Sequence, residues 1–592
     1  MMPPFRRHRL DTRLPAGPGL APGTTDARGR LRAGLPIDWP FTTALVLIAG
    51  YMAYAFAVVH FGIHDGGQGD DSARLLIAFR MRDDLSSAWT MFLTQPWPPM
   101  PYILQVLAGR ALHLVAGFSD RQFVQSALLC SVTLFVLHLL VALVTCRRLG
   151  STLAGLLYIV GMISAGSISL LAISAMAEAP AYFFLAVAAL LLTMDSAVAV
   201  AAAGLMFMAG SLCRSEIAVF GAFTAAILLF RHGWWRSFMF GAISVAAAAV
   251  KTLHTLLLPS GGMSYFDLRK FYWLGNNPGQ RLHFLLSQMA AAQRIDTSDV
   301  TVLALLVAVV LVQGFLVHRR EPGDTLATRR VRYALGVSLL GSATVAFLVG
   351  LCAFGIISWN SRYQLIPLSI TFFGLCLFAA GHDRRSGAWG MAVLGVATVA
   401  LFFVGASGAF ASFGVVEASV PVDLRQARMV IDRLAGPNNL LVVDALAFWD
   451  TYPLMHAEID AGATRSACAY DMPPVVETAG MRAAIAQGHS LKTVDLLGYI
   501  DQYQPTILAT AGPEWRAWLD SIPRFMDKQE RASYILPSIT WQSPSVGELK
   551  LDKIGSGKRF LVTRIFQSPK VSLYRLTRIK SGPASRADRP KF

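Results

Sequence analysis

The chain has 592 residues, and a soluble protein of that length would contain about four domains of roughly 150 residues each. Hydrophobic residues make up 54% of the sequence and charged residues 15%, whereas soluble domains have about 25% charged residues. This composition excludes an ordinary cytosolic enzyme and an intrinsically disordered protein. The net charge of +16 does not indicate nucleic-acid binding, because the arginines gather in short stretches between apolar runs, where they act as topology signals.

The N-terminal residues 1–40 form a basic arm rich in Pro and Gly, which we expect to be flexible and to stay in the cytoplasm. The apolar run at 41–63 is too long for the core of a signal peptide, and no small-residue cleavage site follows it. This run therefore predicts a retained membrane-spanning helix whose C-terminal end faces the other side.

Ten further apolar runs give about eleven predicted spans and place the two termini on opposite faces of the membrane. The short loops that carry arginine pairs then all fall on the N-terminal side, as the positive-inside rule requires. The spans between 177 and 213 are short and their turn carries no arginine, so the count is weakest there. The runs lie near 124–146, 152–175, 177–194, 197–213, 217–230, 237–258, 300–317, 333–357, 364–380 and 388–409.

Three parts of the chain are then exposed on the outer face: a loop at 64–102, a loop at 259–299 and a domain at 411–592. The domain alternates amphipathic stretches with short β-rich runs, which predicts an α/β fold. The fold class is thus a polytopic α-helical membrane protein, spanning at 41–410, with a C-terminal extracytoplasmic α/β domain. The amphipathic stretches lie at 423–434 and 513–522, and the β-rich runs include 440–443, 506–509 and 571–576.

Charged residues gather at the outer ends of these spans. Charges beside apolar helices are costly and commonly functional, so we expect them to form one pocket at the membrane boundary. Such a pocket suits a substrate with a lipid tail and an anionic head. The residues are His64, Asp65, Asp70 and Asp71 after the first span, and Glu178, Arg214, Glu216, Arg362 and Tyr363 at later outer turns.

Each of these residues also has a purely structural interpretation. The stretch at 64–71 is compatible with a helix-terminating turn capped by Asp. Glu178 stands before Ala179-Pro180, which is ordinary chemistry for a helix start. Arg214 and Glu216 can simply neutralise each other, and Arg362 can extend outward to the interface.

A proline-rich segment, residues 95–102, precedes the apolar stretch at 103–118. Four prolines in eight residues predict an extended approach to that stretch rather than a regular helix. The segment is either a rigid loop or a fixed wall that holds the acidic loop over the membrane surface.

The order of these features resembles the GT-C superfamily, polytopic glycosyltransferases that use polyprenyl-phosphate sugars and include protein O-mannosyltransferases and the lipid A aminoarabinose transferase. The resemblance rests on an acidic pair after the first span, a proline-rich segment, an acid before proline, an Arg-x-Glu junction and an Arg-Tyr pair. The acidic pair here is Asp-Asp where Asp-Glu is frequent. The matching residues are Asp70-Asp71, Pro98-Pro99-Met100-Pro101-Tyr102, Glu178-Ala179-Pro180, Arg214-Ser215-Glu216 and Arg362-Tyr363.

The resemblance implies an integral membrane glycosyltransferase that moves a sugar from a polyprenyl monophosphate to an envelope glycolipid, polysaccharide or protein. Asp71 or Asp70 would be the general base, and Glu178 would hold the acceptor or the sugar. Cations would stabilise the departing phosphate. The expected phosphate-binding residues are Arg214, Arg362, Lys270 and Arg281, and further substrate contacts are expected from His64, Asp65, Glu216 and Tyr363.

The expected location is the inner membrane of a bacterium, with a cytoplasmic N-terminus and a periplasmic C-terminal domain. No cofactor is firmly indicated, and a divalent metal stays open because the spacing of the acids is not diagnostic. The alternative function is a transporter or flippase of a lipid-linked substrate. Transporters place ionisable groups near the midplane, whereas these charges crowd one boundary, which favours the enzyme.

Overall fold

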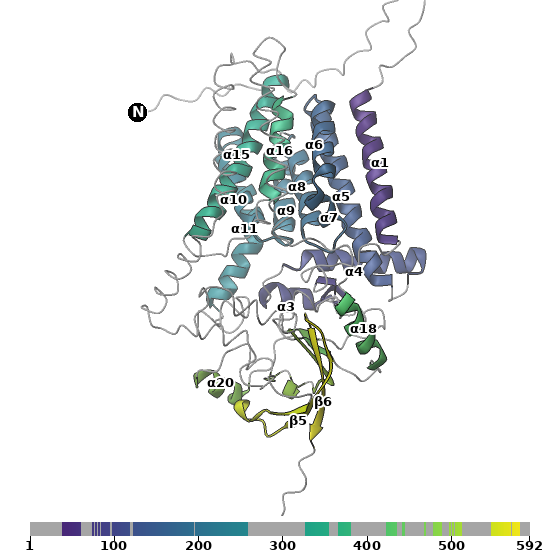
Figure 1. Ribbon diagram of the computed structural model, residues 1–592. Helices are drawn as coiled ribbons and strands as arrows, with labels where there is room; N and C mark the ends of the chain where they lie inside the picture. Colours follow the sequence, from purple (N-terminus) through teal and green to yellow (C-terminus); the bar gives the residue numbers. More distant parts are fainter. Residues whose placement is uncertain are drawn as a thin grey trace, which may run out of the picture.

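The computed structural model shows a bundle of apolar helices with a β-sheet domain at one end (Figure 1). The structure describes residues 38–60, 74–94 (without 76, 80, 83 and 84), 98–118, 122–194, 196–257, 326–353, 365–379, 422–434, 441–443, 467–468, 478–487, 497–502 (without 499), 504–511, 546–569 and 571–579.

Three helices are long and apolar enough to cross a membrane: α1 (Trp39–His60), α5 (Phe123–Arg148) and α15 (Leu326–Ala353), the last over Arg330–Gly350. A rise of 1.5 Å per residue makes the 22 residues of α1 about 33 Å long, enough for a hydrocarbon core of about 30 Å. Large apolar side chains of α1, such as Val46 and Tyr54, are exposed, as expected for a surface that contacts lipid. The predicted polytopic helical membrane fold is confirmed.

Seven other helices complete the described part of the bundle. The two short spans predicted between 177 and 213 are helices, and the Ser196 hydroxyl caps the second by accepting the N–H of Ala199. The predicted runs at 300–317 and 388–409 lie outside the described residues. The helices are α6 (Thr152–Ser164), α7 (Gly166–Ala172), α8 (Glu178–Leu191), α9 (Ala197–Ser211), α10 (Ile217–His232), α11 (Trp234–Leu257) and α16 (Leu365–Ala379).

The run at 152–175, predicted as one span, is broken into α6 and α7. The break is at Ala165, whose φ of −74° and ψ of 96° are extended rather than helical. Close packing also shapes α6, because a Cβ at Gly161 would overlap with the Phe372 ring of α16. The bundle therefore contains a short, separate helix just before the turn that leads into α8.

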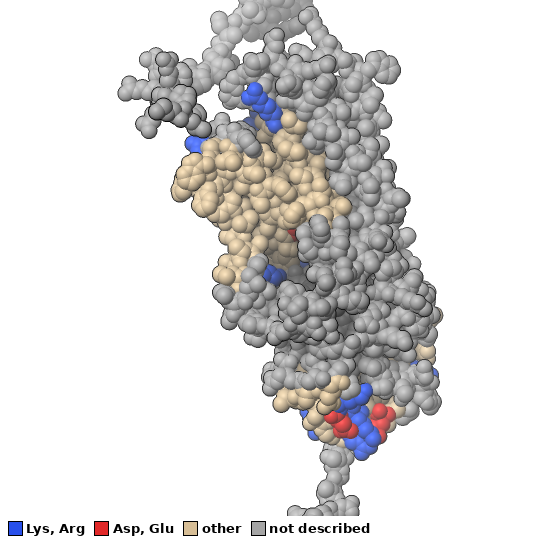
Figure 2. Space-filling view, turned by 90° about the vertical axis from the view of Figure 1, so that its left-hand side faces the viewer, with Lys and Arg blue, Asp and Glu red and all other residues tan. Residues whose placement is uncertain are grey.

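The arginines of the short loops collect at one end of the bundle. The Thr152 hydroxyl donates to Asp38 Oδ1 at 2.9 Å, and Arg330 Nη1 donates to the carbonyl of Gly150 at 2.8 Å. These contacts bring together the start of α1, the turn between α5 and α6, and the start of α15. We call this end the arginine end; it carries Arg147, Arg148, Arg330 and Arg332. Basic side chains stand at the upper edge of the apolar face in Figure 2.

Two helices, α3 (Ser87–Thr94) and α4 (Met100–Ala116), lie across the opposite end of the bundle (Figure 1). The predicted extended approach up to residue 102 is wrong, because α4 begins at Met100 and contains Pro101 in its first turn. Proline is tolerated there, since a first-turn N–H has no partner within the helix. Pro99 precedes the helix with helical angles, φ −83° and ψ −16°.

The C-terminal residues form one six-stranded mixed sheet with the order β2-β1-β3-β6-β5-β4. β1 pairs in parallel with β2 and β3, and the remaining neighbours pair antiparallel. The predicted strands near 440–443, 506–509 and 571–576 are confirmed. The strands are β1 (Leu441–Val443), β2 (Ala467–Cys468), β3 (Ile507–Ala511), β4 (Val546–Lys550), β5 (Arg559–Gln567) and β6 (Val571–Ile579).

Helices pack on both faces of this sheet, which confirms the predicted α/β domain. Alternate residues of β3 point to opposite faces: Ile507 shares a core with Ile431 of α18 (Val422–Leu434), and Leu508 shares another with Met481 of α20 (Ala479–Ala486). The core on the α18 side is continuous with that of the helical bundle. The sheet is therefore anchored to the bundle at the end where α3 and α4 lie. The predicted helix at 513–522 lies outside the described residues.

Candidate functional site

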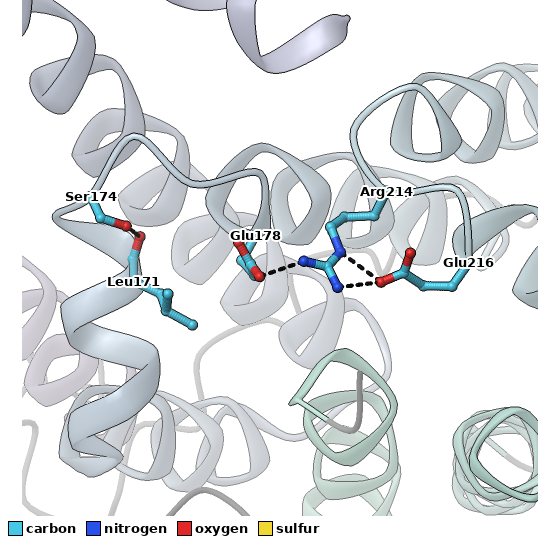
Figure 3. Close-up of polar contacts among 5 residues, drawn as sticks. All are labelled: Leu171, Ser174, Glu178, Arg214 and Glu216. Atoms are coloured by element: carbon cyan, nitrogen blue, oxygen red, sulfur yellow. Dashed lines mark hydrogen bonds and ion pairs between the residues drawn. The ribbon is translucent and has the colours of Figure 1, made fainter. Parts of the chain in front are cut away.

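Two turns far apart in the sequence meet through one arginine (Figure 3). Arg214, in the turn between α9 and α10, extends Nη1 to within 2.6 Å of Glu178 Oε1, on the first turn of α8. Its Nε and Nη2 lie 2.6 and 2.5 Å from Glu216 Oε1. We call these three residues the Arg214 cluster.

The Arg214 cluster is buried. The side chains of Glu178, Arg214 and Glu216 are 1%, 9% and 12% exposed. Charges at such depth persist only when they are paired, because transfer of an isolated ion out of water is costly. The structural roles that the sequence allowed for these residues are present. Arg214 pairs with Glu216, and Glu178 lies at a helix N-terminus, where the helix dipole favours an acid. The pairing across 36 residues links them into one site.

Helix α4 is tied to both turns that carry the cluster. The backbone N–H of Met100 donates to the carbonyl of Leu212 at 2.9 Å, in the turn after α9. Gln105 Nε2 donates to the carbonyl of Ala175 at 3.0 Å, in the turn before α8. Gln105 is 2% exposed, so this hydrogen bond is shielded from water. The proline-rich segment therefore leads into a helix that fixes the spacing of the two turns.

A fourth charge, Arg74, lies at the same place. Arg74 is 3% exposed and lies near Cys213, the residue before Arg214. Its guanidinium carbon lies 6.0 Å from the centre of the Tyr102 ring on α4. Sequence reasoning located Arg74 in the first outer loop and assigned it no role. The available signal was the apolar run directly after it, residues 75–79, which indicates burial.

These four side chains carry two positive and two negative charges, so the described site is balanced. Interactions among charges strengthen as water is excluded, because the effective dielectric constant falls. An incoming anion here would meet two buried guanidinium groups, of which that of Arg214 is held by Glu178 and Glu216. A hydroxyl group would meet the Glu178 carboxylate, whose position is set by both α8 and Arg214.

The other predicted site residues lie outside the described residues, and their roles stay predictions. They are His64, Asp65, Asp70, Asp71, Lys270, Arg281, Arg362 and Tyr363. Within the part of the chain that is described, no group of three or more His, Cys, Asp or Glu side chains is arranged to hold a metal ion. Glu178 and Glu216 are both engaged with Arg214.

No protein-family model matches the chain, and no curated protein sequence matches it. Among solved structures, the chain is similar to ArnT from Cupriavidus metallidurans bound to undecaprenyl phosphate, with 12% identity over 92% of this chain and 99% of that one and a TM-score of 0.41. It is also similar to the Archaeoglobus fulgidus oligosaccharyltransferase in complex with Zn and sulfate, with 12% identity over 78% and 68% of the two chains and a TM-score of 0.38.

A third similar structure is the archaeal oligosaccharyltransferase AglB from Archaeoglobus fulgidus in complex with an inhibitory peptide and a dolichol-phosphate. Its identity is 11% over 78% of this chain and 69% of that one, with a TM-score of 0.34. Because these identities and TM-scores are low, no residue role is transferred from these structures, and the roles of residues in this chain are argued from its own geometry.

Proposed function

We propose that the chain is an integral membrane glycosyltransferase that moves a sugar from a polyprenyl monophosphate to an envelope glycolipid, polysaccharide or protein. The observation that carries this proposal is the Arg214 cluster with Arg74: buried charges of both signs at one end of an apolar bundle. A lipid-linked donor fits this place, because its tail stays in the bilayer while its phosphate reaches the charged end. Undecaprenyl phosphate and dolichol-phosphate, the lipids in two of the similar structures, are of this class.

The proposed reaction is a direct displacement at the anomeric carbon. Asp71 or Asp70 takes the proton from the acceptor hydroxyl, whose oxygen forms the new glycosidic bond. The bond between the anomeric carbon and the phosphate oxygen breaks, and the polyprenyl phosphate leaves with the electron pair. The reaction therefore needs one base, cations at the phosphate and a group that orients the acceptor or the sugar.

The described residues supply the last two requirements in this proposal. Arg74 and Arg214 would hold the phosphate through charge-assisted hydrogen bonds, which are roughly twice as strong as neutral ones. Glu178 would orient the acceptor or the sugar, and Glu216 would hold Arg214. Arg362, Lys270 and Arg281 would add positive charge, and His64, Asp65 and Tyr363 would contact the substrate.

The arginine end supports the proposed orientation. Short loops rich in Lys and Arg stay in the cytoplasm, so the Arg214 cluster and the sheet domain would face the periplasm of a bacterial inner membrane. Nucleotide sugars are absent from that side. A lipid-linked sugar is therefore the donor expected there.

The test is reconstitution of the full-length chain in proteoliposomes with radiolabelled sugars on undecaprenyl phosphate and an envelope extract as acceptor. Label transferred to the extract supports the enzyme. Label that crosses the bilayer without transfer supports a flippase and contradicts the proposal, as does the absence of both.

The base assignment has its own test in the same assay. Asp70→Ala or Asp71→Ala lowers the transfer rate by about 10² to 10⁴, the usual cost of losing a general base. Asp552→Ala is the control, because Asp552 is an exposed acid in the sheet domain and leaves the rate unchanged. Full activity of both the single variants and the double variant, with unchanged thermal unfolding, would show that neither aspartate is the base.

A further inference from the structure

A cavity of about 630 Å³ is lined by residues of α5, α6, α8, α9, α10, α15 and α16. It is separate from the Arg214 cluster, none of whose residues line it. Its volume falls within the roughly 300–1,000 Å³ of cavities that hold small ligands. Most of the side chains around it are apolar, including Leu185, Phe207 and Leu340.

The depth of the cavity matches one leaflet of a bilayer. Its lining along α8 runs from Tyr182 to Leu192, the residue that follows the helix, which is ten helical steps or about 15 Å. Half of a hydrocarbon core of about 30 Å is the same length. On α15 the lining begins at Arg332, an exposed residue of the arginine end. The cavity therefore reaches from the membrane interior to the surface at the arginine end.

Most polar side chains of the cavity wall form hydrogen bonds within the protein. The Tyr182 hydroxyl is 3.1 Å from the Ser369 hydroxyl, and His138 Nε2 is 3.0 Å from the Tyr158 hydroxyl. Thr224 differs, because its buried hydroxyl oxygen has no hydrogen-bond partner among the described residues. The interior thus favours an apolar occupant, and among the described lining residues the one Lys or Arg side chain is that of Arg332 at the mouth.

We propose that this cavity binds one hydrocarbon chain of an anionic phospholipid from the leaflet at the arginine end, with its headgroup beside Arg332. The leaflet-sized depth, the apolar wall and the charge at the mouth each point to this occupant. The site is distinct from that of the sugar transfer proposed above, because no residue of the Arg214 cluster lines it and its mouth is at the arginine end, although its inner end at Tyr182 is one turn of α8 from Glu178. It shares helix α8 with the Arg214 cluster.

The chain-binding part is tested by photolabelling the full-length protein in nanodiscs with phosphatidylglycerol that carries a diazirine on one acyl chain. Label is expected on peptides of α8, α10 and α15. Gly336→Leu fills the cavity, because a Cβ at Gly336 meets only Ile227 Cγ2, at 3.7 Å. We expect this variant to lose most of that label. Gly350→Leu is the matched control on the same helix, since nothing lies within 4 Å of a Cβ there.

The headgroup part is tested by titrating phosphatidylglycerol into the delipidated protein and counting bound lipids by native mass spectrometry. Arg332→Gln is expected to weaken binding about tenfold or more, the worth of one hydrogen bond to a charged group. Arg332→Lys retains most of the affinity, and Arg148→Gln, an exposed arginine of the same end, serves as the control.

Three results would overturn the inference. They are unchanged labelling of the Gly336→Leu protein when its thermal unfolding matches that of the wild type, equal labelling by the matched phosphatidylcholine probe, and equal losses of lipid binding in Arg332→Gln and Arg148→Gln.

Discussion

Removal of the guanidinium at Arg214 tests whether the Arg214 cluster is a buried, interdependent unit. In Arg214→Gln, the Glu178 and Glu216 carboxylates lose three contacts of 2.5–2.6 Å. Breaking a buried ion pair from one side costs about 3–5 kcal/mol, because the remaining charge stays uncompensated. Glu178 is 1% exposed and carries that full cost, whereas Glu216 at 12% is partly screened by water. We expect a loss of about 4 kcal/mol in the free energy of unfolding.

The matched comparison removes all three charges at once. The variant Glu178→Gln/Arg214→Met/Glu216→Gln removes Arg214 together with both of its ion-pair partners, so no charge of the Arg214 cluster is left without its partner, and we expect a loss of only about 2 kcal/mol or less. Both variants are measured as full-length protein in detergent micelles, by denaturant titration followed through tryptophan fluorescence. A loss below about 1 kcal/mol in Arg214→Gln, the value of an exposed pair, would refute the reasoning. A triple variant less stable than Arg214→Gln would also refute it.

Two further predictions concern the packing that positions the site. Gly161→Ala is expected to lower the free energy of unfolding by about 1–3 kcal/mol, because its Cβ overlaps with the Phe372 ring. Gly50→Ala is the control, because nothing lies within 4 Å of a Cβ there. Equal melting temperatures of the two variants would contradict the packing at Gly161. Gln105→Leu removes the buried hydrogen bond from Gln105 Nε2 to the carbonyl of Ala175, so we expect a loss of about 1 kcal/mol in the free energy of unfolding and a lower transfer rate. Wild-type stability of this variant would show that α4 does not fix the turn.

The sequence by itself predicted most of the elements. Apolar runs of about 20 residues predict α1, α5 and α15, because only a helix satisfies its backbone hydrogen bonds within the bilayer. Short β-rich runs likewise predict β3 and β6. The break at Ala165 was not predictable in this way, since the apolar run continues through it and hydropathy does not report backbone angles.

The sequence also determined which charges lie at the ends of the spans, because their positions relative to the apolar runs can be read without the tertiary structure. Only the tertiary structure decided which of them meet. Arg214 reaches Glu178 because α8 and α9 pack side by side and α4 is bonded to the turn at one end of each. Arg74 joins them through burial that its loop position did not reveal. Contacts between residues far apart in the chain depend on packing, which local sequence patterns do not encode.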